Sequence, residues 1–366
     1  MSERASVVTI VGARPQFIKA AMVQRAIRAD GRVRETLIHT GQHYDSNMSD
    51  VFFDELGIEP PTHNLGIGSG AHGAQTGRML EAIEDVLEQE RPDVVIVYGD
   101  TNSTLAGVLA ASKLHVPVAH VEAGLRSFNR RMPEEVNRIV ADHISDILFA
   151  PTATAVANLV AEGVPTERVL HVGDVMYDAA LHFGAVARQR HDLATRAVSE
   201  KRYAVCTVHR QENTDDASRL TSILTALQRI RERMPVVMPM HPRARQAVST
   251  HGLEHLLAGI TCTEPLSYLQ MQRLTADAGV VLTDSGGLQK EAYFLQVPCV
   301  TLRDETEWVE TVEGGWNIVA GSSVAKVVEA ATKERRLDPQ TRPFGDGASS
   351  IAIAHALATF LDRCTS

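Results

Sequence analysis

Residues 93–107 read DVVIVYGDTNSTLAG and carry the clearest fold signal in the chain. An unbroken apolar run ends at Gly99 and Asp100, and a helical pattern follows over 101–114. Strands without polar alternation are typical of parallel sheets, because helices cover both of their faces. The segment therefore predicts a strand, a tight turn and a helix, with polar side chains where the strand ends.

The same alternation of apolar runs and helical patterns continues to both ends of the chain. The predicted strands are 7–12, 33–40, 93–99, 116–122, 146–151, 168–173, 203–209, 236–242, 259–265, 279–285 and 297–302. So many strands exceed one standard doubly wound sheet, and 366 residues suit about two domains. We expect an α/β protein with two Rossmann-like halves, a break near 172–179 and a helix-like linker at 183–202.

The composition excludes several classes of partner. With 36 Lys and Arg against 45 Asp and Glu, the net charge is −9, so the chain lacks the positive field that binds duplex nucleic acid. No apolar run reaches the ~18 to 20 residues of a membrane span. The four cysteines lack metal-type spacing, which favours free thiols in a reducing compartment. We expect a cytoplasmic protein without a metal, a nucleic-acid partner or a membrane partner.

The first predicted strand leads into GARPQFIK, residues 12–19. Gly12 allows a tight turn, and Arg14 and Lys19 add two cations at the positive end of a helix. This combination is typical of an anion site, although a solvated helix start with two surface cations has the same sequence. The segment matches neither G-x-G-x-x-G nor G-x-x-x-x-G-K-[ST], so it indicates neither a dinucleotide site nor a P-loop.

Carboxylates follow the next strands. Asp100 ends one strand, Glu122 ends the following one in HVEAGLRS, and Glu134 comes soon afterwards in MPEEVNR. Carboxyl ends of parallel strands meet at one sheet edge, where converging carboxylates acquire different pKa values and so different acid and base roles. Each residue alone fits a helix cap or a surface ion pair, whereas the three together favour a catalytic site.

Three predicted strands of the second half lead into polar segments, which read VHRQEN, MHPRAR and TDSGGLQKEA. A Ser-Gly-Gly turn that opens a helix is a natural cradle for a diphosphate, although alone it also fits a plain helix cap. Neither H-E-x-x-H nor G-x-S-x-G occurs, so neither a metal site nor a serine hydrolase is indicated. Glu291 is placed to accept from a vicinal diol. The candidate residues of this half are His209, Arg210, His241, Ser285, Gly286, Gly287 and Glu291.

Six strand-end segments together resemble one enzyme family. GARPQFIK, YGDTNSTLAG, HVEAGLRS, PEEVNR, HRQEN and DSGGLQKEA are similar, in this order and over most of the chain, to motifs of the non-hydrolysing UDP-N-acetylglucosamine 2-epimerases. The resemblance implies a glycosyltransferase B-type fold, with two Rossmann-like domains facing a cleft. It implies an N-terminal domain at 1–175, completed by a C-terminal helix within 350–366, and a UDP-binding domain at 176–349.

The resemblance also implies reversible inversion at C2 of a UDP-2-acetamido sugar, by anti elimination of UDP to a 2-acetamidoglucal and return of UDP. No NAD, other cofactor or metal is expected. The expected setting is polysaccharide biosynthesis, such as that of O-antigen, by a homodimer with a UDP-sugar substrate. Catalytic roles fall on Asp100, Glu122, Glu134 and His209, the phosphate-side basic pair on Arg14 and Lys19, and the other substrate contacts on Arg210, His241, Ser285, Gly286, Gly287 and Glu291.

Two departures from the family pattern lie in the second half. Gln211 replaces the second arginine of HRREN, and TEWVE at 306–310 replaces TERPE. TEWVE, together with GWN at 315–317, is more similar to the corresponding sequence of the family branch that epimerises UDP-2,3-diacetamido-2,3-dideoxyglucuronate. That uronate carries an additional negative charge, for which Arg130 and Arg131 are candidate partners.

Three other functions fit parts of the sequence. A glycosyltransferase of the same fold would use the nucleotide cradle but would not need the carboxylates of the first half. A hydrolysing 2-epimerase would release the free sugar, so the fate of UDP distinguishes it. A regulatory module that binds a nucleotide sugar without chemistry predicts that replacing the carboxylates changes nothing measurable.

Overall fold

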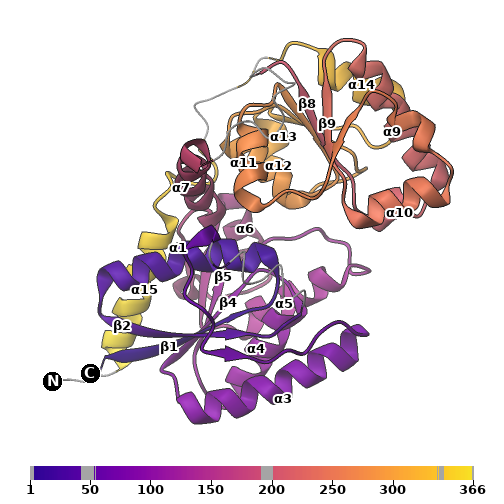
Figure 1. The fold of residues 1–366 in the computed structure, drawn as a ribbon. Coiled ribbons are helices and arrows are strands. Elements are labelled where there is room, and N and C mark those ends of the chain that lie inside the picture. Colours follow the sequence, from indigo (N-terminus) through magenta and orange to yellow (C-terminus); the bar gives the residue numbers. More distant parts are fainter. Residues whose placement is uncertain are drawn as a thin grey trace. The chain divides into compact units, whose positions relative to one another are not determined.

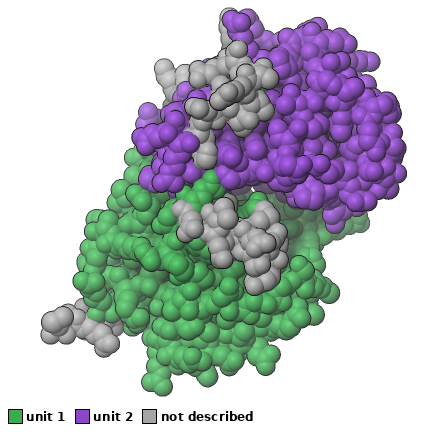
Figure 2. All heavy atoms as spheres, in the orientation of Figure 1, with its two compact units in different colours: residues 1–179, 343–366 green, residues 180–342 purple. Residues whose placement is uncertain are grey.

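The computed structural model describes residues 4–42, 53, 55–190, 201–335, 337 and 342–364. The chain divides into two compact units, unit 1 with residues 1–179 and 343–366 and unit 2 with residues 180–342 (Figure 2). Each unit has its own parallel sheet, so the predicted α/β class with two Rossmann-like halves is confirmed. Among the described helices, none has both the length and the apolar character that a membrane crossing requires.

Unit 1 contains a seven-stranded parallel sheet in the order β3-β2-β1-β4-β5-β6-β7. Figure 1 labels β1, β2, β4 and β5 of this sheet. The C-terminal helix α15 packs against α1 and belongs to this unit. The strands are β1 (Ala5–Val11), β2 (Val33–His39), β3 (His63–Asn64), β4 (Val94–Tyr98), β5 (Val118–Val121), β6 (Ile147–Ala150) and β7 (Val169–His171). The helices are α1 (Arg14–Asp30), α3 (His72–Glu90), α4 (Asn102–Lys113), α5 (Pro133–Ile144), α6 (Ala153–Ala161), α7 (Val175–Arg190), which continues into unit 2, and α15 (Ser349–Cys364).

Local sequence explains where the helices of unit 1 begin. Thr101 is the N-cap of α4, and its side-chain oxygen accepts from the backbone N–H of Thr104 at 3.3 Å. Thr152 caps α6 in the same way. Pro15 and Pro133 lie in the first turns of α1 and α5, where the missing N–H costs nothing. Helices α1, α4 and α6 each start within a few residues of the preceding strand, so their N-termini lie at the carboxyl edge of the sheet, whereas α5 follows β5 after a longer loop.

Unit 2 contains a six-stranded parallel sheet in the order β10-β9-β8-β11-β12-β13. Helix α9 buries Leu220, Leu224 and Leu227 at helical spacing, and α14 packs beside it (Figure 1). The strands are β8 (Ala204–Thr207), β9 (Val236–Pro239), β10 (Thr261–Thr263), β11 (Val280–Thr283), β12 (Cys299–Thr301) and β13 (Asn317–Val319). The helices are α8 (Gln211–Thr214), α9 (Ala217–Arg231), α10 (Pro242–Thr250), α11 (Tyr268–Ala276), α12 (Gly286–Phe294), α13 (Val309–Glu313) and α14 (Val324–Thr332).

Several elements differ from the sequence-based expectation. Strands β3 and β13 were not predicted, because β3 has two polar residues and β13 starts with the buried Asn317. The predicted strand 236–242 ends at Pro239, since His241 caps α10 instead. The expected break near 172–179 already contains the start of α7, where Asp174 accepts from the backbone N–H of Met176 at 2.8 Å. Most of the expected linker, 191–200, lies outside the described residues.

Candidate functional site

Both sheets reverse their strand order at one point, between β1 and β4 in unit 1 and between β8 and β11 in unit 2. At such a switch point the turns leave neighbouring strands in opposite directions, and ligands of α/β proteins bind there, at the carboxyl ends. The candidate residues follow these strands and their neighbours: Arg14 and Lys19 after β1, Asp100 after β4, Glu122 after β5, His209 and Arg210 after β8, His241 after β9, and Ser285 after β11.

The turn between β1 and α1 is held by Gln16. Its side-chain oxygen accepts from the backbone N–H of Gly12 at 2.7 Å, and its amide nitrogen donates to the carbonyl oxygen of Tyr98 at 2.7 Å. A Cβ on Gly12 would clash with the side chain of Ser103, so only glycine fits there. The first turn of α1 is thus fixed beside the end of β4, with the exposed Arg14 at its start.

Lys19 lies further along α1, where it is buried and forms an ion pair with Glu122. Glu122 has a φ of 73°, which is uncommon for a residue with a Cβ and recurs at functional sites. A Cβ on Gly99 would lie 3.2 Å from Oε2 of Glu122 and 3.4 Å from Nζ of Lys19. The ion pair therefore sits directly against the turn that follows β4.

Asp100 follows that turn and forms an ion pair with Arg138 of α5. Its side chain is 31% exposed, whereas that of Arg138 is 8% exposed. Burial raises the pKa of the Asp100 carboxyl above its usual range, Arg138 opposes this shift, and the charge of Glu122 adds to it. Asp100 is thus accessible from solvent and holds its proton more readily than an ordinary aspartate.

Glu134 and Glu135 are adjacent on the first turn of α5 but differ in their contacts. Glu135 is buried, accepts from the backbone N–H of Ser127 at 2.9 Å and pairs with Arg138 at 3.1 Å. Glu134 is half-buried and makes no hydrogen bond or ion pair within the described part of the chain. It precedes Arg138 by four residues, so it lies on the same helix face as the cation bound to Asp100.

In unit 2, the buried Asp284 after β11 holds the turn after β8. Its carboxylate accepts from the backbone N–H groups of His209 and Arg210, both at 3.0 Å, and from Nδ2 of Asn213 at 3.1 Å. Nδ1 of His209 is also 3.0 Å from this carboxylate. Burial disfavours the charge on Asp284, but these hydrogen bonds outweigh burial and keep its pKa below the usual range. His209 therefore points Nε2, not Nδ1, toward any ligand.

The start of α12 provides backbone donors at the end of β11. Ser285 is the N-cap, and its side-chain oxygen accepts from the backbone N–H of Leu288 at 3.4 Å. A Cβ on Gly286 would clash with the carboxylate of Glu307, which Arg303 binds at 3.0 Å. Because the first N–H groups of a helix have no partner inside it, this turn suits an anion.

Glu291 is buried in the middle of α12. Burial raises the pKa of its carboxyl to about 7, and the neighbouring Lys290 opposes the shift. Nζ of Lys290 lies 3.8 Å from the ring centroid of Trp308, a cation–π contact. Trp308 belongs to the TEWVE segment that departs from the family pattern, so this departure places an indole ring against Lys290 of α12.

His241 and Arg210 lie beside His209 in unit 2. His241 caps α10, where its Nδ1 accepts from the backbone N–H of Arg243 at 3.2 Å, and its ring centroid is 5.5 Å from that of His209. Nε of Arg210 is buried and makes no hydrogen bond within the described residues. Unit 2 thus gathers two imidazoles and a guanidinium at the ends of β8 and β9.

Sequence reasoning assigned no role to Gln16, Arg138, Lys290 or Glu307. The sequence did contain a local signal for Arg138, because it follows Glu134 by one helical turn and so lies on the same face of the helix. Gln16 had no such signal, because its partner Tyr98 is 82 residues away in the chain.

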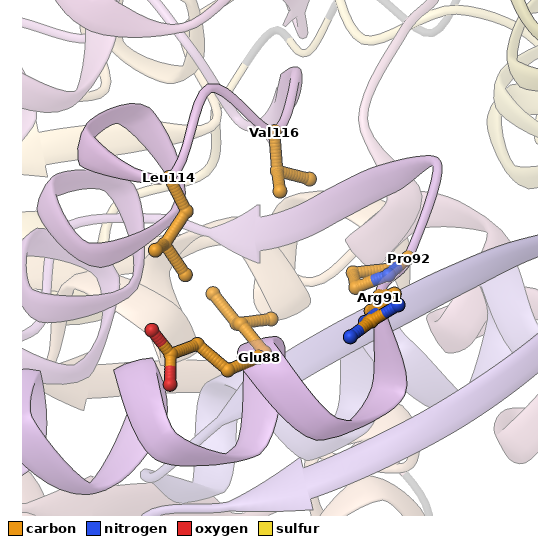
Figure 3. A pocket seen from close by; sticks show the side chains of 6 residues that line it. Glu88, Arg91, Pro92, Leu114 and Val116 are labelled. Atoms are coloured by element: carbon orange, nitrogen blue, oxygen red, sulfur yellow. The ribbon is translucent and has the colours of Figure 1, made fainter.

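A surface pocket with a volume of ≈ 550 Å³ lies in unit 1 (Figure 3). Its lining comes from the end of α3 and from the segments that precede β4 and β5, so it is at the amino ends of the strands. The candidate residues of unit 1 lie at the opposite edge of this sheet. The lining residues are Leu87, Glu88, Arg91, Pro92, Leu114 and Val116.

Two Rossmann-like units, one with paired carboxylates and cations at its switch point and the other with a helix-terminal anion cradle, define an enzyme of nucleotide-linked substrates. A family model described as UDP-N-acetylglucosamine 2-epimerase matches residues 25–358. The chain belongs to this family, which confirms the resemblance seen in the strand-end motifs.

Two curated relatives and one solved structure are among the proteins most similar to this chain. The UDP-2,3-diacetamido-2,3-dideoxy-D-glucuronate 2-epimerase of Pseudomonas aeruginosa is 50% identical, over 96% of this chain and 99% of the relative. A UDP-N-acetylglucosamine 2-epimerase homolog of Methanococcus maripaludis has the same identity and coverage. The UDP-GlcNAc 2-epimerase of Methanocaldococcus jannaschii, solved in complex with UDP-GlcNAc and UDP, is 42% identical with a TM-score of 0.87, over 98% of this chain and 100% of that one.

Proposed function

We propose that this protein is a UDP-sugar 2-epimerase that inverts C2 of a UDP-2-acetamido sugar and keeps UDP in the product. Membership of the family supports the reaction class. The observation that carries the proposal is the cluster in unit 1, where two carboxylates from neighbouring strand ends each bind a buried cation.

We assign proton transfer to the carboxylates of unit 1. A base removes the C2 proton, the C–H electrons form the C1=C2 bond, and the C1–O bond breaks to release UDP. UDP then returns to C1 while a proton is added to the other face of C2. Removal of a proton from one face of C2 and its return to the other face require more than one acid or base. Asp100, Glu122 and Glu134 are the groups available at this edge. The raised pKa of Asp100 supports such a role.

We assign UDP binding to unit 2. Ser285, Gly286 and Gly287 offer a helix N-terminus to the diphosphate, and Glu291 accepts from the ribose hydroxyls. Arg210 follows β8 and His241 follows β9, in the same sheet as β11, which Ser285 follows. His209, oriented by Asp284 through Nδ1, presents Nε2 to the departing diphosphate, and in its doubly protonated form it donates from Nε2 to the charge that develops there.

We propose UDP-2,3-diacetamido-2,3-dideoxyglucuronate as the physiological substrate. The 50% identity to the Pseudomonas aeruginosa enzyme of that name supports this choice. Arg130 and Arg131 are exposed on the loop before α5, where they are available to a substrate carboxylate. Trp308 stands where the family has an arginine, which removes one polar contact and adds an apolar wall, as a different sugar or a rearranged uridine pocket would require.

UDP-N-acetylglucosamine is the second candidate substrate, because the Methanocaldococcus jannaschii structure with that ligand matches nearly the whole chain. Incubation with each sugar in deuterated water, followed by NMR at C2, separates the two. The proposed reaction incorporates deuterium and yields a UDP-linked epimer. Release of a free sugar would indicate a hydrolysing enzyme, and transfer to an acceptor without C2 exchange would indicate a glycosyltransferase.

The uronate preference has its own test. The variant Arg130→Ala/Arg131→Ala should lose kcat/KM on the uronate by about 30-fold, roughly 2 kcal/mol, and change little on UDP-N-acetylglucosamine. Equal losses on both sugars, or turnover of UDP-N-acetylglucosamine alone by the unmodified protein, would contradict the preference.

We also propose a cytoplasmic homodimer. Cys206 and Cys299 are buried free thiols, as expected in a reducing compartment. Sedimentation of the purified protein tests the dimer, and fractionation of the source cells tests the location.

A further inference from the structure

A fully buried ion pair lies beneath the carboxylates of unit 1. It joins His120 of β5 to Asp142 of α5, with Nδ1 of the ring 2.8 Å from Oδ1 of the carboxylate and both side chains 0% exposed. On its other side, Nε2 of His120 is 2.7 Å from the carbonyl oxygen of Gly99. Neither residue belongs to the candidate set described above.

The two contacts of His120 require two donors. A carbonyl oxygen only accepts hydrogen bonds, and so does an ionised carboxylate. Asp142 is ionised, since it also accepts from Nη1 of Arg126 at 2.7 Å and from the backbone N–H of Gly124 at 3.1 Å. His120 therefore donates from both ring nitrogens and carries a positive charge.

Arg126 holds Asp142 from a further side. It binds the Asp142 carboxylate and also forms a two-point ion pair with Glu162, whose side chain is 28% exposed. The buried carboxylate of Asp142 is thus fixed by His120, Arg126 and the backbone N–H of Gly124 together.

The pair holds both of the turns that carry the reactive carboxylates. Gly99, bound by His120, directly precedes Asp100. Gly124, bound by Asp142, lies two residues after Glu122, in the segment where Glu122 has its positive φ. One rigid buried group is thus attached to the turn after β4 and to the turn after β5.

We propose that His120 and Asp142 form a positioning pair that sets Asp100 and Glu122 for proton transfer at C2. The inference rests on the proposed function and adds two residues that act through the backbone without contact to the substrate. Displacement of reacting groups by about 1 Å costs of the order of 100-fold in rate, so the pair should affect kcat far more than binding.

Two measurements test the proposal. In the unmodified protein, ¹⁵N NMR of the histidine rings at pH 7.5 should show a directly attached proton on both nitrogens of His120, with the signal identified by its loss in His120→Gln. In kinetics, His120→Gln should lower kcat about 100-fold. KM and the Kd for UDP should change less than threefold, because UDP binding is assigned to unit 2. His355→Gln, on the exposed face of α15, is the matched control.

Each outcome decides the question. A ring nitrogen without a proton at His120, a kcat of His120→Gln within threefold of normal, or parallel losses of kcat, UDP affinity and thermal stability would overturn the proposal. Should His120→Gln fail to fold, Asp142→Asn and the ring NMR of the unmodified protein provide the test. Absence of C2 exchange in the unmodified protein would instead contradict the proposed function.

Discussion

The six strands of unit 2 follow the same order as the first six strands of unit 1, but the two sheets use carboxylates differently near their switch points. In unit 1, Asp100 binds one guanidinium and Glu122 one ammonium, and Asp100 remains 31% exposed. In unit 2, Asp284 is fully buried, and its oxygens accept from the backbone and side chains of the turn after β8. One edge therefore has a carboxylate that is partly open to solvent, whereas the carboxylate of the other edge is buried and holds a histidine in a fixed orientation.

The difference follows from how many donors surround each carboxylate. Asp284 has its lone pairs filled by protein donors, and its pKa lies below the usual range. Asp100 has lost water without gaining comparable donors, and its pKa lies above the usual range. The same fold thus produces a scaffold carboxylate or a reactive one, depending on local hydrogen bonding.

The largest expected effect tests the reactive edge. Glu122→Gln should lower kcat for C2 inversion by about 1,000-fold, since a positioned acid or base is lost, while the Kd for UDP stays within threefold. NMR of the sugar and calorimetry of UDP measure the two quantities. Glu59→Gln, in an exposed ion pair of the same unit, is the control. Activity within tenfold of normal would show that Glu122 is not a catalytic acid or base.

The second effect tests the oriented histidine. His209→Asn keeps an amide near Asp284 but removes Nε2, so kcat should fall about 100-fold with little change in UDP affinity. Steady-state kinetics and calorimetry provide the readouts. His251→Asn, a half-buried histidine of the same unit, serves as control. An unaltered kcat would assign His209 a purely structural role.

A smaller effect concerns the nucleotide. Glu291→Ala should weaken UDP binding about tenfold, roughly 1.4 kcal/mol, because hydrogen bonds from the ribose are lost. Glu122→Gln should bind UDP normally in the same assay, which separates the two units. Equal affinity for the unmodified protein and Glu291→Ala in calorimetry would remove Glu291 from the binding site.

The smallest effect is a pH dependence. With a pKa of about 7, Glu291 is mostly protonated at pH 6 and mostly ionised at pH 8. An ionised carboxylate accepts stronger hydrogen bonds, so affinity for uridine, which has no phosphate to titrate, should rise about threefold over this range. Glu291→Gln should bind uridine equally at both pH values. A flat profile for the unmodified protein would mean that the ribose does not contact this carboxyl.

Much of the fold could be predicted because its signals are local. The run 94–98 forms a buried strand, and Thr101 caps the helix that follows, as the sequence indicates. The same logic placed Asp100, Glu122 and Ser285 at strand ends. The prediction missed β3 and β13, because these edge strands have only two and three residues and each is defined by its pairing with one neighbouring strand.

By itself, the sequence determined the α/β class, the strand-end position of the charged residues and the resemblance to one family, since each depends on residues close together in the chain. Only the tertiary structure decided which charges meet. Lys19 reaches Glu122 across 103 residues, Arg138 reaches Asp100 across 38, and Asp284 reaches His209 across 75. The charged partners of each group, and its loss of water on packing, set the direction of its pKa shift. The sequence could not predict these shifts, because partners and packing depend on distances that no local pattern encodes.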